Sequence, residues 1–398
     1  MIISRLIRRS LFVTASAALV ATFATAGTST GQTLKDTAGT ARDTIPDNRP
    51  SAVPRTIPSV APAPVQPTGR ELLLSAYGQT DSASAKADYD NIIALCRRAL
   101  ADDVSPAAVT YGRKLMSWAY NRRGELIVEA EGEHKALADF HRAVQIDPQR
   151  WRAVHNRAVS YFALGRTDLA MSDFTRTIQL EPRFSTAYFN RGELRFEQGD
   201  LRGAVSDYDS AIRLGVKGSS AYEGRGYALL QLGRYAAAVA DLNMVIRFEP
   251  NDAAAHLSRG EARAKLHRWE QAARDFNRAI ALDGKLTRAY ERAAWLMATC
   301  PEARFRQTKL AVDTARKAVE LAGETNHGNL NVLAAAYANN GEFEKARLIQ
   351  AKAIDTAPQA VTADYRQSMR QYERSRPVRE SGRAVQIGRK PTRRNRTR

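Results

Sequence analysis

Apolar residues follow one another at spacings of three and four between residues 117 and 286, and this pattern repeats every 34 residues. The spacing places apolar side chains on one face of a helix. Pro148, Pro182 and Pro250 share one frame of 34 residues, and Val216 and Gly284 fill it in the other two periods. The chain therefore contains five contiguous repeats: 117–150, 151–184, 185–218, 219–252 and 253–286.

Three positions of the repeat keep one kind of residue. Position 8 is small: Gly124, Ala158, Gly192, Gly226 and Gly260. Position 20 is always alanine: Ala136, Ala170, Ala204, Ala238 and Ala272. Position 24 is large and apolar: Phe140, Phe174, Tyr208, Leu242 and Phe276. The pattern predicts two antiparallel helices that approach closely at the small residues, with the large residue filling the space beside them.

Glycine and proline predict where these helices end. Gly165, Gly199 and Gly233 lie near the middle of their repeats, where a glycine ends a first helix and begins a tight turn. The proline at position 32 ends the second helix, because it cannot continue the hydrogen-bond ladder. One such helical pair cannot bury its apolar face alone, so consecutive repeats must stack.

These residues resemble the tetratricopeptide-repeat family. The resemblance implies an all-α fold, a right-handed superhelical solenoid of helix–turn–helix repeats. Two divergent repeats follow over 287–360, with about five extra residues around Cys300–Arg304, and a capping helix is expected over 361–376. An incomplete helical unit is expected over 70–116. The segment Trp295–Pro301 is similar to one in exported bacterial repeat proteins of the planctomycete type.

The ends of the chain differ from the repeats. Residues 1–26 begin with Arg5, Arg8 and Arg9, continue with a short apolar run and end in a small-x-small sequence, as a secretory signal peptide does. We expect export to the periplasm or cell envelope; an uncleaved anchor in the inner membrane is the alternative. Residues 27–69 hold seven of the 15 prolines and are expected to form a disordered linker.

Charge is concentrated at the C-terminus. The formal net charge is +18, and residues 366–398 supply eleven Arg and one Lys against two Glu, or +10. We expect residues 377–398 to be a basic disordered tail. The tail could dock on an anionic envelope polymer such as a polysaccharide, or on lipid headgroups. It could also fold back into the groove described below as an internal ligand. Nucleic acid is a less favoured partner, because export would separate the chain from it.

A charge pair recurs with the repeat. Arginine occupies position 7: Arg123, Arg157, Arg191, Arg225 and Arg259. Aspartate occupies position 23: Asp139, Asp173, Asp207, Asp241 and Asp275. The two rows predict a structural ladder of ion pairs, closed either within each repeat or between adjacent repeats.

Catalytic and metal-binding patterns are not found. The sequence has no His-Glu-x-x-His, no Cys-x-x-Cys, no phosphate-binding loop and no Gly-x-Ser-x-Gly elbow. His134 and His141 could share a helix face, but no third ligand accompanies them. Cys96 and Cys300 are far apart in a solenoid and are expected to be buried thiols. We therefore expect no enzyme, no cofactor and no metal.

The family resemblance implies that first helices line a concave groove with positions 2, 5, 9, 12 and 13. In this chain the implied groove residues are Trp118, Asn121, Arg152, His155, Phe162, Phe189, Glu193, Phe196, Glu197, Glu223, Tyr227, Leu230, Leu257 and Glu261. Apolar side chains with four Glu suit an apolar and basic segment of a protein or peptide partner. The sequence thus favours a non-enzymatic binding scaffold in the bacterial envelope. The alternatives are a regulatory subunit of an envelope enzyme complex, or a binder of an anionic polymer through the tail. Partner identity and oligomeric state stay open.

Overall fold

The protein has an all-α helical repeat fold. A computed structural model describes residues 67–380, and in that range it contains seventeen α-helices, one short 3-10 helix and no strand. The expected signal peptide, most of the expected linker and the tail beyond residue 380 lie outside the described residues. The chain divides at Lys217 and Gly218 into two compact halves, and each is described by itself.

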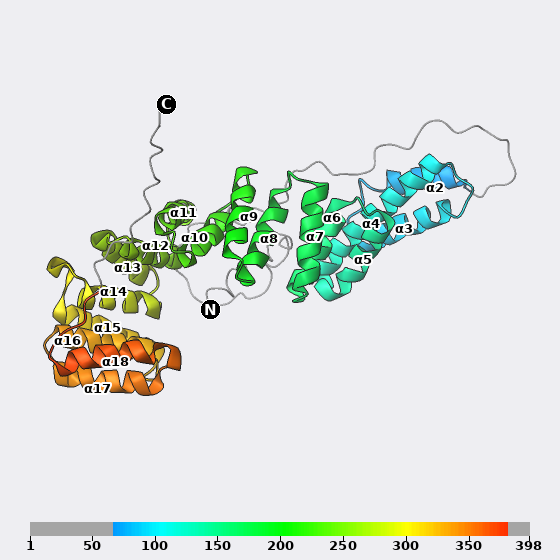
Figure 1. Cartoon of the computed structure of the whole chain (residues 1–398). Helices are drawn as coiled ribbons and strands as arrows, with labels where there is room; N and C mark the ends of the chain where they lie inside the picture. Colours follow the sequence, from blue (N-terminus) through cyan, green and yellow to red (C-terminus); the bar gives the residue numbers. More distant parts are fainter. Residues whose placement is uncertain (1–66, 381–398) are drawn as a thin grey trace, which may run out of the picture. The chain divides into compact units, whose positions relative to one another are not determined.

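The N-terminal half holds eight described helices (Figure 1). They are α2 (Gly69–Gly78), α3 (Lys86–Ala99), α4 (Pro106–Glu131), α5 (Glu133–Ile146), α6 (Trp151–Ala163), α7 (Thr167–Leu180), α8 (Ser185–Glu197) and α9 (Leu201–Arg213). Each helix packs against the next, and the first helices of consecutive repeats also touch, α4 against α6 and α6 against α8.

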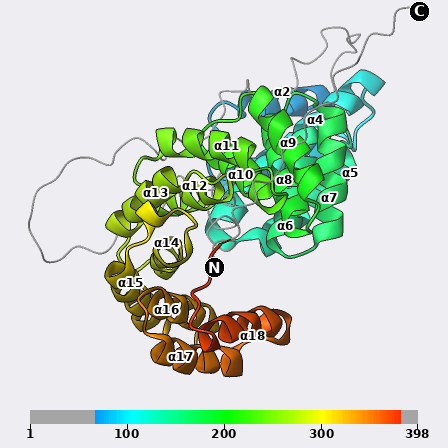
Figure 2. The ribbon, with the colours of Figure 1, turned by 60° about the vertical axis from the view of Figure 1, so that its left-hand side comes forward.

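The C-terminal half continues the same arrangement. Its helices are α10 (Ser220–Gln231), α11 (Tyr235–Phe248), α12 (Ala253–Lys265), α13 (Trp269–Leu282), α14 (Thr287–Thr299), η1 (Ala303–Phe305), α15 (Thr308–Ala322), α16 (His327–Asn339), α17 (Phe343–Thr356) and α18 (Gln359–Glu373). The first helices α10, α12, α14 and α16 touch in succession, and α16, α17 and α18 lie side by side at the end (Figure 2).

Helix boundaries depart from the sequence prediction in three places. Position 117, taken as the start of the first repeat, lies inside α4, because no proline or left-handed residue interrupts the chain between Pro106 and Glu131. The last helix, α18, begins at Gln359, two residues before the expected capping helix. The first residues of the expected tail, 377–380, are among the described residues and pack against the C-terminal half.

First helices end in a turn with one left-handed residue. That residue is Gly165 (φ 71°), Gly199 (φ 80°), Gly233 (φ 70°) and, in the fifth repeat, His267 (φ 58°). The next amide reaches back into the helix, as Arg166 N–H does to the Tyr161 carbonyl at 2.8 Å. These bonds satisfy carbonyls that the helix end leaves open. His267 adopts a conformation that glycine accepts more readily, and its ring packs edge-on against Trp269 at 5.2 Å.

One first helix, α14, ends without this turn. Cys300 has φ −51° and ψ 132°, and Pro301 follows it, so the chain leaves the helix in an extended conformation. The extra residues form η1 and a loop in which Arg306 donates to the carbonyls of Cys300 and Pro301 at 2.8 and 2.9 Å. The loop returns at Gln307, whose N–H donates to the Met297 carbonyl at 3.2 Å.

Close approach of the paired helices explains the small residues of the repeat. All five alanines at position 20 are fully buried. A Cβ added to Gly124 or Gly260 would lie 2.6 Å from the ring of Phe140 or Phe276, whereas one added to Gly226 would lie 3.5 Å from Leu242. The second repeat carries alanine at position 8, so whether a methyl group fits there depends on how the large side chain at position 24 lies. No helix within residues 67–380 is long and apolar enough to cross a membrane.

We expect Gly260→Ala and Gly226→Ala to change stability in opposite directions. Alanine favours a helix by about 1 kcal/mol over glycine, and at Gly226 the new methyl group makes only an ordinary contact. At Gly260 it would overlap the Phe276 ring, and overpacking costs about 1–3 kcal/mol. Chemical denaturation should show Gly226→Ala to be stabilising and Gly260→Ala destabilising. Equal stabilisation by both would contradict the packing argument.

Candidate protein-binding surface

The ladder of ion pairs closes within each repeat. In all five repeats the arginine at position 7 donates two hydrogen bonds, of 2.6–3.1 Å, to the carboxylate at position 23. The five aspartates are only 3–6% exposed. Two-point contact with a planar guanidinium fixes the rotation of one helix against the other. The pairs therefore set the register of each helical hairpin.

Arg191 and Arg259 also reach the preceding repeat. Arg191 Nη1 donates to Thr175 Oγ1 at 3.2 Å, and Arg259 Nη1 donates to Asn243 Oδ1 at 2.8 Å. The acceptors occupy position 25 of the repeat before. Each of these guanidinium groups thus links the two helices of its own hairpin and the hairpin that precedes it.

Most of the expected groove residues are buried. Eight of the fourteen are at most 8% exposed: Trp118, Asn121, His155, Phe189, Glu193, Glu223, Tyr227 and Leu257. They include every residue at position 5 and two of the three named at position 9. These side chains pack inside the repeats and do not line an open groove.

Polar residues at positions 5, 6 and 9 link consecutive first helices. Asn156 Nδ2 donates to Asn121 Oδ1 at 3.0 Å and to Glu125 Oε1 at 2.9 Å, which joins α6 to α4. Glu261 accepts from Arg292 at 2.8 Å and from Arg288 at 2.8 Å, which joins α12 to α14. These contacts use side chains that a partner would otherwise meet, so the burial has a structural cause.

His155 illustrates the burial. Its ring lies 4.8 Å from the Phe184 ring and 5.7 Å from the Phe174 ring, and Nε2 faces Asn190 Nδ2 at 3.5 Å. Removal from water, with a smaller effect of the Arg152 charge, lowers the pKa of His155 from 6.5 to about 3. His155 is therefore neutral in the folded protein near pH 7.

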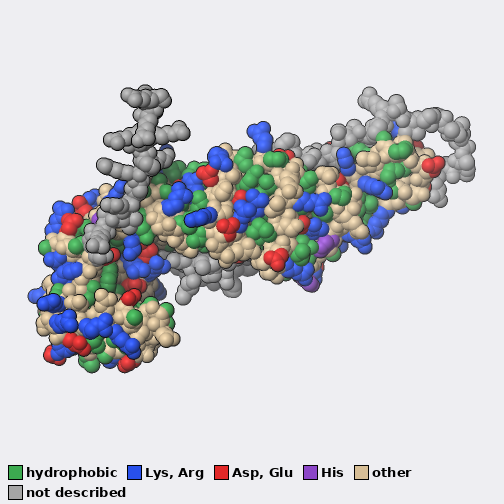
Figure 3. All heavy atoms as spheres, viewed as in Figure 1, with side chains coloured by type: hydrophobic (Ala, Val, Ile, Leu, Met, Phe, Trp, Pro, Cys, Tyr) green, Lys and Arg blue, Asp and Glu red, His purple; other side chains and the backbone are tan. Residues whose placement is uncertain are grey.

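Of the expected groove positions, 12 and 13 are the two that are accessible in all five repeats. Position 12 is apolar and partly exposed in all five repeats: Val128, Phe162 and Phe196 in the N-terminal half, and Leu230 and Ala264 in the C-terminal half. Glu129 and Glu197, at position 13, are exposed in the N-terminal half. Val128 and Glu129 were not expected from the sequence, although their place in the repeat identifies them. Arg152 and Glu261 are partly exposed. Figure 3 shows apolar, basic and acidic side chains interspersed on one face of the molecule.

Comparisons with known proteins identify the repeat. The sequence model of the tetratricopeptide repeat matches residues 155–215, 189–253 and 225–294, which together run without a break from within the second repeat to just beyond the fifth. Residues 155–294 are tetratricopeptide repeats. No curated protein matches the sequence.

Solved structures of tetratricopeptide-repeat proteins are among those to which the chain is similar. A repeat protein from Cytophaga hutchinsonii is 19% identical with a TM-score of 0.48, covering 62% of this chain and 98% of its own. PilF of Pseudomonas aeruginosa is 19% identical (TM-score 0.44), covering 53% and 94%. YrrB, described as a TPR protein with an unusual peptide-binding site, is 17% identical (TM-score 0.38), covering 57% and 97%. These are likenesses of fold alone.

Reactive side chains of the repeats have structural partners. His141 contacts the Leu137 carbonyl at 2.9 Å and the Tyr161 hydroxyl at 2.7 Å. Cys96 and Cys300 are free, buried thiols, and burial raises the pKa of Cys96 to about 12. Within residues 67–380 no group of three His, Cys, Asp or Glu could hold a metal ion.

Removing one carboxylate of the ladder should destabilise the repeats strongly. Asp207 accepts from Arg191 and, at 2.8 Å, from Arg195, and it is 3% exposed. Asp207→Ala would leave two guanidinium groups beside an apolar site, and breaking a buried pair costs about 3–5 kcal/mol. Glu131→Ala, at the end of α4, removes only an exposed pair with Lys135, and exposed pairs of this kind add little to stability. Urea denaturation should separate the two variants; equal losses would contradict a structural role of the ladder.

Stability should fall on acidification below pH 6.5 because of His155. The unfolded chain binds a proton at this side chain near pH 6.5, and the folded chain binds one only near pH 3. The contribution of neutral His155 to the free energy of unfolding is therefore complete above pH 6.5 and is lost progressively between pH 6.5 and 3. One such group accounts for about 1 kcal/mol between pH 6.5 and 5.5. We expect His155→Gln to remove that part of the pH dependence in thermal unfolding. His134→Gln, on the exposed surface of α5, is the control and should leave it unchanged.

Proposed function

We propose that the chain is a binding scaffold that holds a segment of another protein along the first helices of its N-terminal half. The observation that carries the proposal is the row of partly exposed apolar side chains at position 12, Val128, Phe162 and Phe196. The helices that carry them, α4, α6 and α8, pack in succession. Partly exposed apolar side chains at regular intervals, two of them aromatic here, are the kind of anchor on which binding energy concentrates.

The charge beside this row favours a basic partner. Glu129 and Glu197 are exposed next to Val128 and Phe196, one residue further along the same helices. The other acids expected in the groove are less accessible: Glu193 is buried and accepts from the Tyr208 hydroxyl, and Glu261 is paired with arginines. A segment with apolar residues and Lys or Arg therefore suits this surface.

The proposed location is the bacterial envelope. Residues 1–26 have the order of charge, apolar run and small residues that directs export, and they support it from the sequence. The basic tail could add attachment to an anionic polymer or lipid headgroups. A regulatory subunit of an envelope enzyme would use the same surface, and the chemistry of the captured partner would distinguish it from a scaffold.

Site-specific photo-crosslinking tests the binding surface. A benzoylphenylalanine in place of Phe196 should give an adduct of defined mass in intact cells, and the same group in place of Leu169 should not. Leu169 is the matched control, because it is 49% exposed but lies on α7, a second helix of the same half. Glu197→Lys should reduce the adduct several-fold, as expected for a charge at the edge of an interface.

The outcomes are distinct. Equal adducts at Phe196 and Leu169, or none at either, would reject the binding surface. Recovery of a chain that begins at Gly27 from the envelope fraction would support export. Recovery of the full chain from the cytoplasm would reject export and leave the binding surface to be judged by its own adducts.

A further inference from the structure

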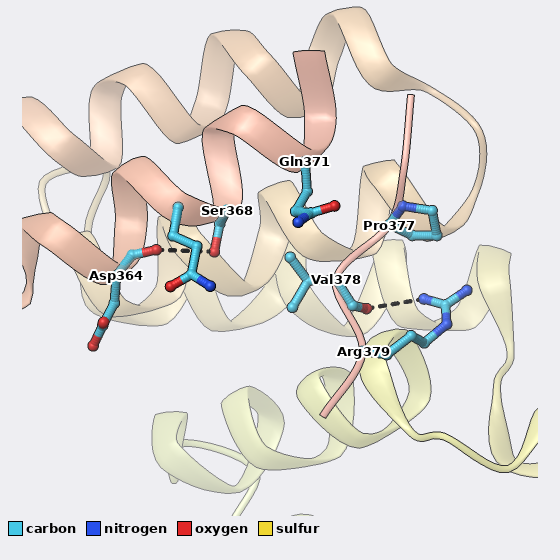
Figure 4. A pocket seen from close by; sticks show the side chains of 7 residues that line it. Asp364, Ser368, Gln371, Pro377, Val378 and Arg379 are labelled. Carbon is cyan, nitrogen blue, oxygen red and sulfur yellow. Dashed lines mark hydrogen bonds between the residues drawn. The ribbon is translucent and has the colours of Figure 1, made fainter. Parts of the chain in front are cut away.

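The chain turns back on itself after its last helix. α18 ends at Glu373, and Ser375 takes a left-handed conformation with φ 54°. Arg376 N–H donates to the Gln371 carbonyl at 2.9 Å, which fixes the reversal. Residues 377–380, named here the return segment, then run across the C-terminal half away from α18 (Figure 4).

The return segment meets the open end of α14. Glu380 N–H donates to the Thr299 carbonyl at 2.9 Å, and Arg379 Nη1 donates to the Ala298 carbonyl at 3.2 Å. A helix end leaves such carbonyls without partners and carries a partial negative charge, which favours both an amide and a guanidinium donor. In α6, α8, α10 and α12 the amide of the left-handed residue closes the carbonyl equivalent to that of Ala298, as Gly165 N–H does to the Phe162 carbonyl at 3.0 Å. The helix α14 instead ends at Cys300–Pro301 and lacks this turn.

Two side chains of the return segment contact complementary groups of the C-terminal half. Val378 packs against the buried cluster that contains Ala298 and Tyr337. The Glu380 carboxylate lies 3.8 Å from Lys265 Nζ of α12. The segment thus presents an apolar residue, an arginine and an acid to three different features of the half: a core cluster, a helix C-terminus and a lysine.

Few contacts attach the return segment to the C-terminal half. The return segment contacts the inner helices through two hydrogen bonds, one partly buried valine and one long ion pair. On its other side, a recess of about 410 Å³ separates it from α18, lined by Asp364, Gln367, Ser368, Gln371, Pro377, Val378 and Arg379 (Figure 4). The return segment therefore has room beside it on the side of α18.

From these contacts we infer that the C-terminal end of α14, with Lys265 and the cluster under Val378, is a second peptide-binding site that the chain fills with its own return segment. The external ligand of the site is an extended protein segment with an apolar residue, an arginine and an acid in succession. Such a segment binds by displacing residues 377–380. This site lies in the other half of the chain from the position-12 row and does not depend on it.

Two truncations with the same net charge test the inference. A chain ending at Arg376 lacks the return segment and a chain ending at Glu380 keeps it, and the charges of Arg379 and Glu380 cancel between them. The probe is a fluorescein-labelled peptide of residues 375–385, measured by anisotropy. A tethered ligand competes at an effective concentration of about millimolar. We expect saturable binding to the chain ending at Arg376 and at least tenfold weaker binding to the full chain and to the chain ending at Glu380.

Variants distinguish peptide binding at this site from nonspecific attraction and from the effects of misfolding. Full-length Val378→Asp should open the site without truncation and should bind the peptide as the chain ending at Arg376 does. A peptide with the Val378→Asp change should bind at least fivefold more weakly, and Lys265→Ala in the shortened chain should weaken the original peptide. No saturable binding up to about 1 mM, equal binding to all three chains, or equal binding of a reversed-sequence peptide would overturn the inference.

Discussion

The close approach of two helices within each hairpin is the constraint on which the structure depends. Alanine at position 20 and a small residue at position 8 let the backbones meet, and a large side chain at position 24 fills the remaining space. The buried arginine–aspartate pairs then fix the rotation of the two helices. Because a hairpin of this size exposes apolar surface on both sides, the stack is what makes it stable. The accessible surfaces are therefore those that the stacking of the hairpins leaves uncovered.

Stacking also decides which polar residues are free to act. Some polar side chains at positions 6 and 9 bond between consecutive first helices, as Asn156 does to Glu125 and Arg292 does to Glu261. Positions 12 and 13 lie further along the helix and stay accessible. The end of α14 differs because its turn is replaced by Cys300–Pro301, so its carbonyls are available to another chain segment. Accessible groups thus remain at positions 12 and 13, which stacking leaves uncovered, and at the end of α14, where the usual turn is replaced.

Much of the architecture could be predicted from the sequence, because it depends on local spacing. The period of 34 and the turns at Gly165, Gly199 and Gly233 follow from patterns within one repeat. His267 could not be predicted to replace glycine, since its unfavourable conformation is imposed by the hairpin around it. The residues expected in the groove at position 5 are buried for a related reason. Whether a side chain faces a partner or the next helix depends on the rotation between repeats, which no single repeat encodes.

The burial of the two thiols gives the folded chain a chemical inertness that its cysteine content does not suggest. At pH 7 a thiol with a pKa of about 12, such as Cys96, exists as thiolate in only about one molecule in 100,000. Disulfide exchange and alkylation proceed through the thiolate, so both are slow while the helices stay packed. Oxidants would find these sulfur atoms only when a hairpin opens. The modification rate of Cys96 therefore reports how often the N-terminal stack separates.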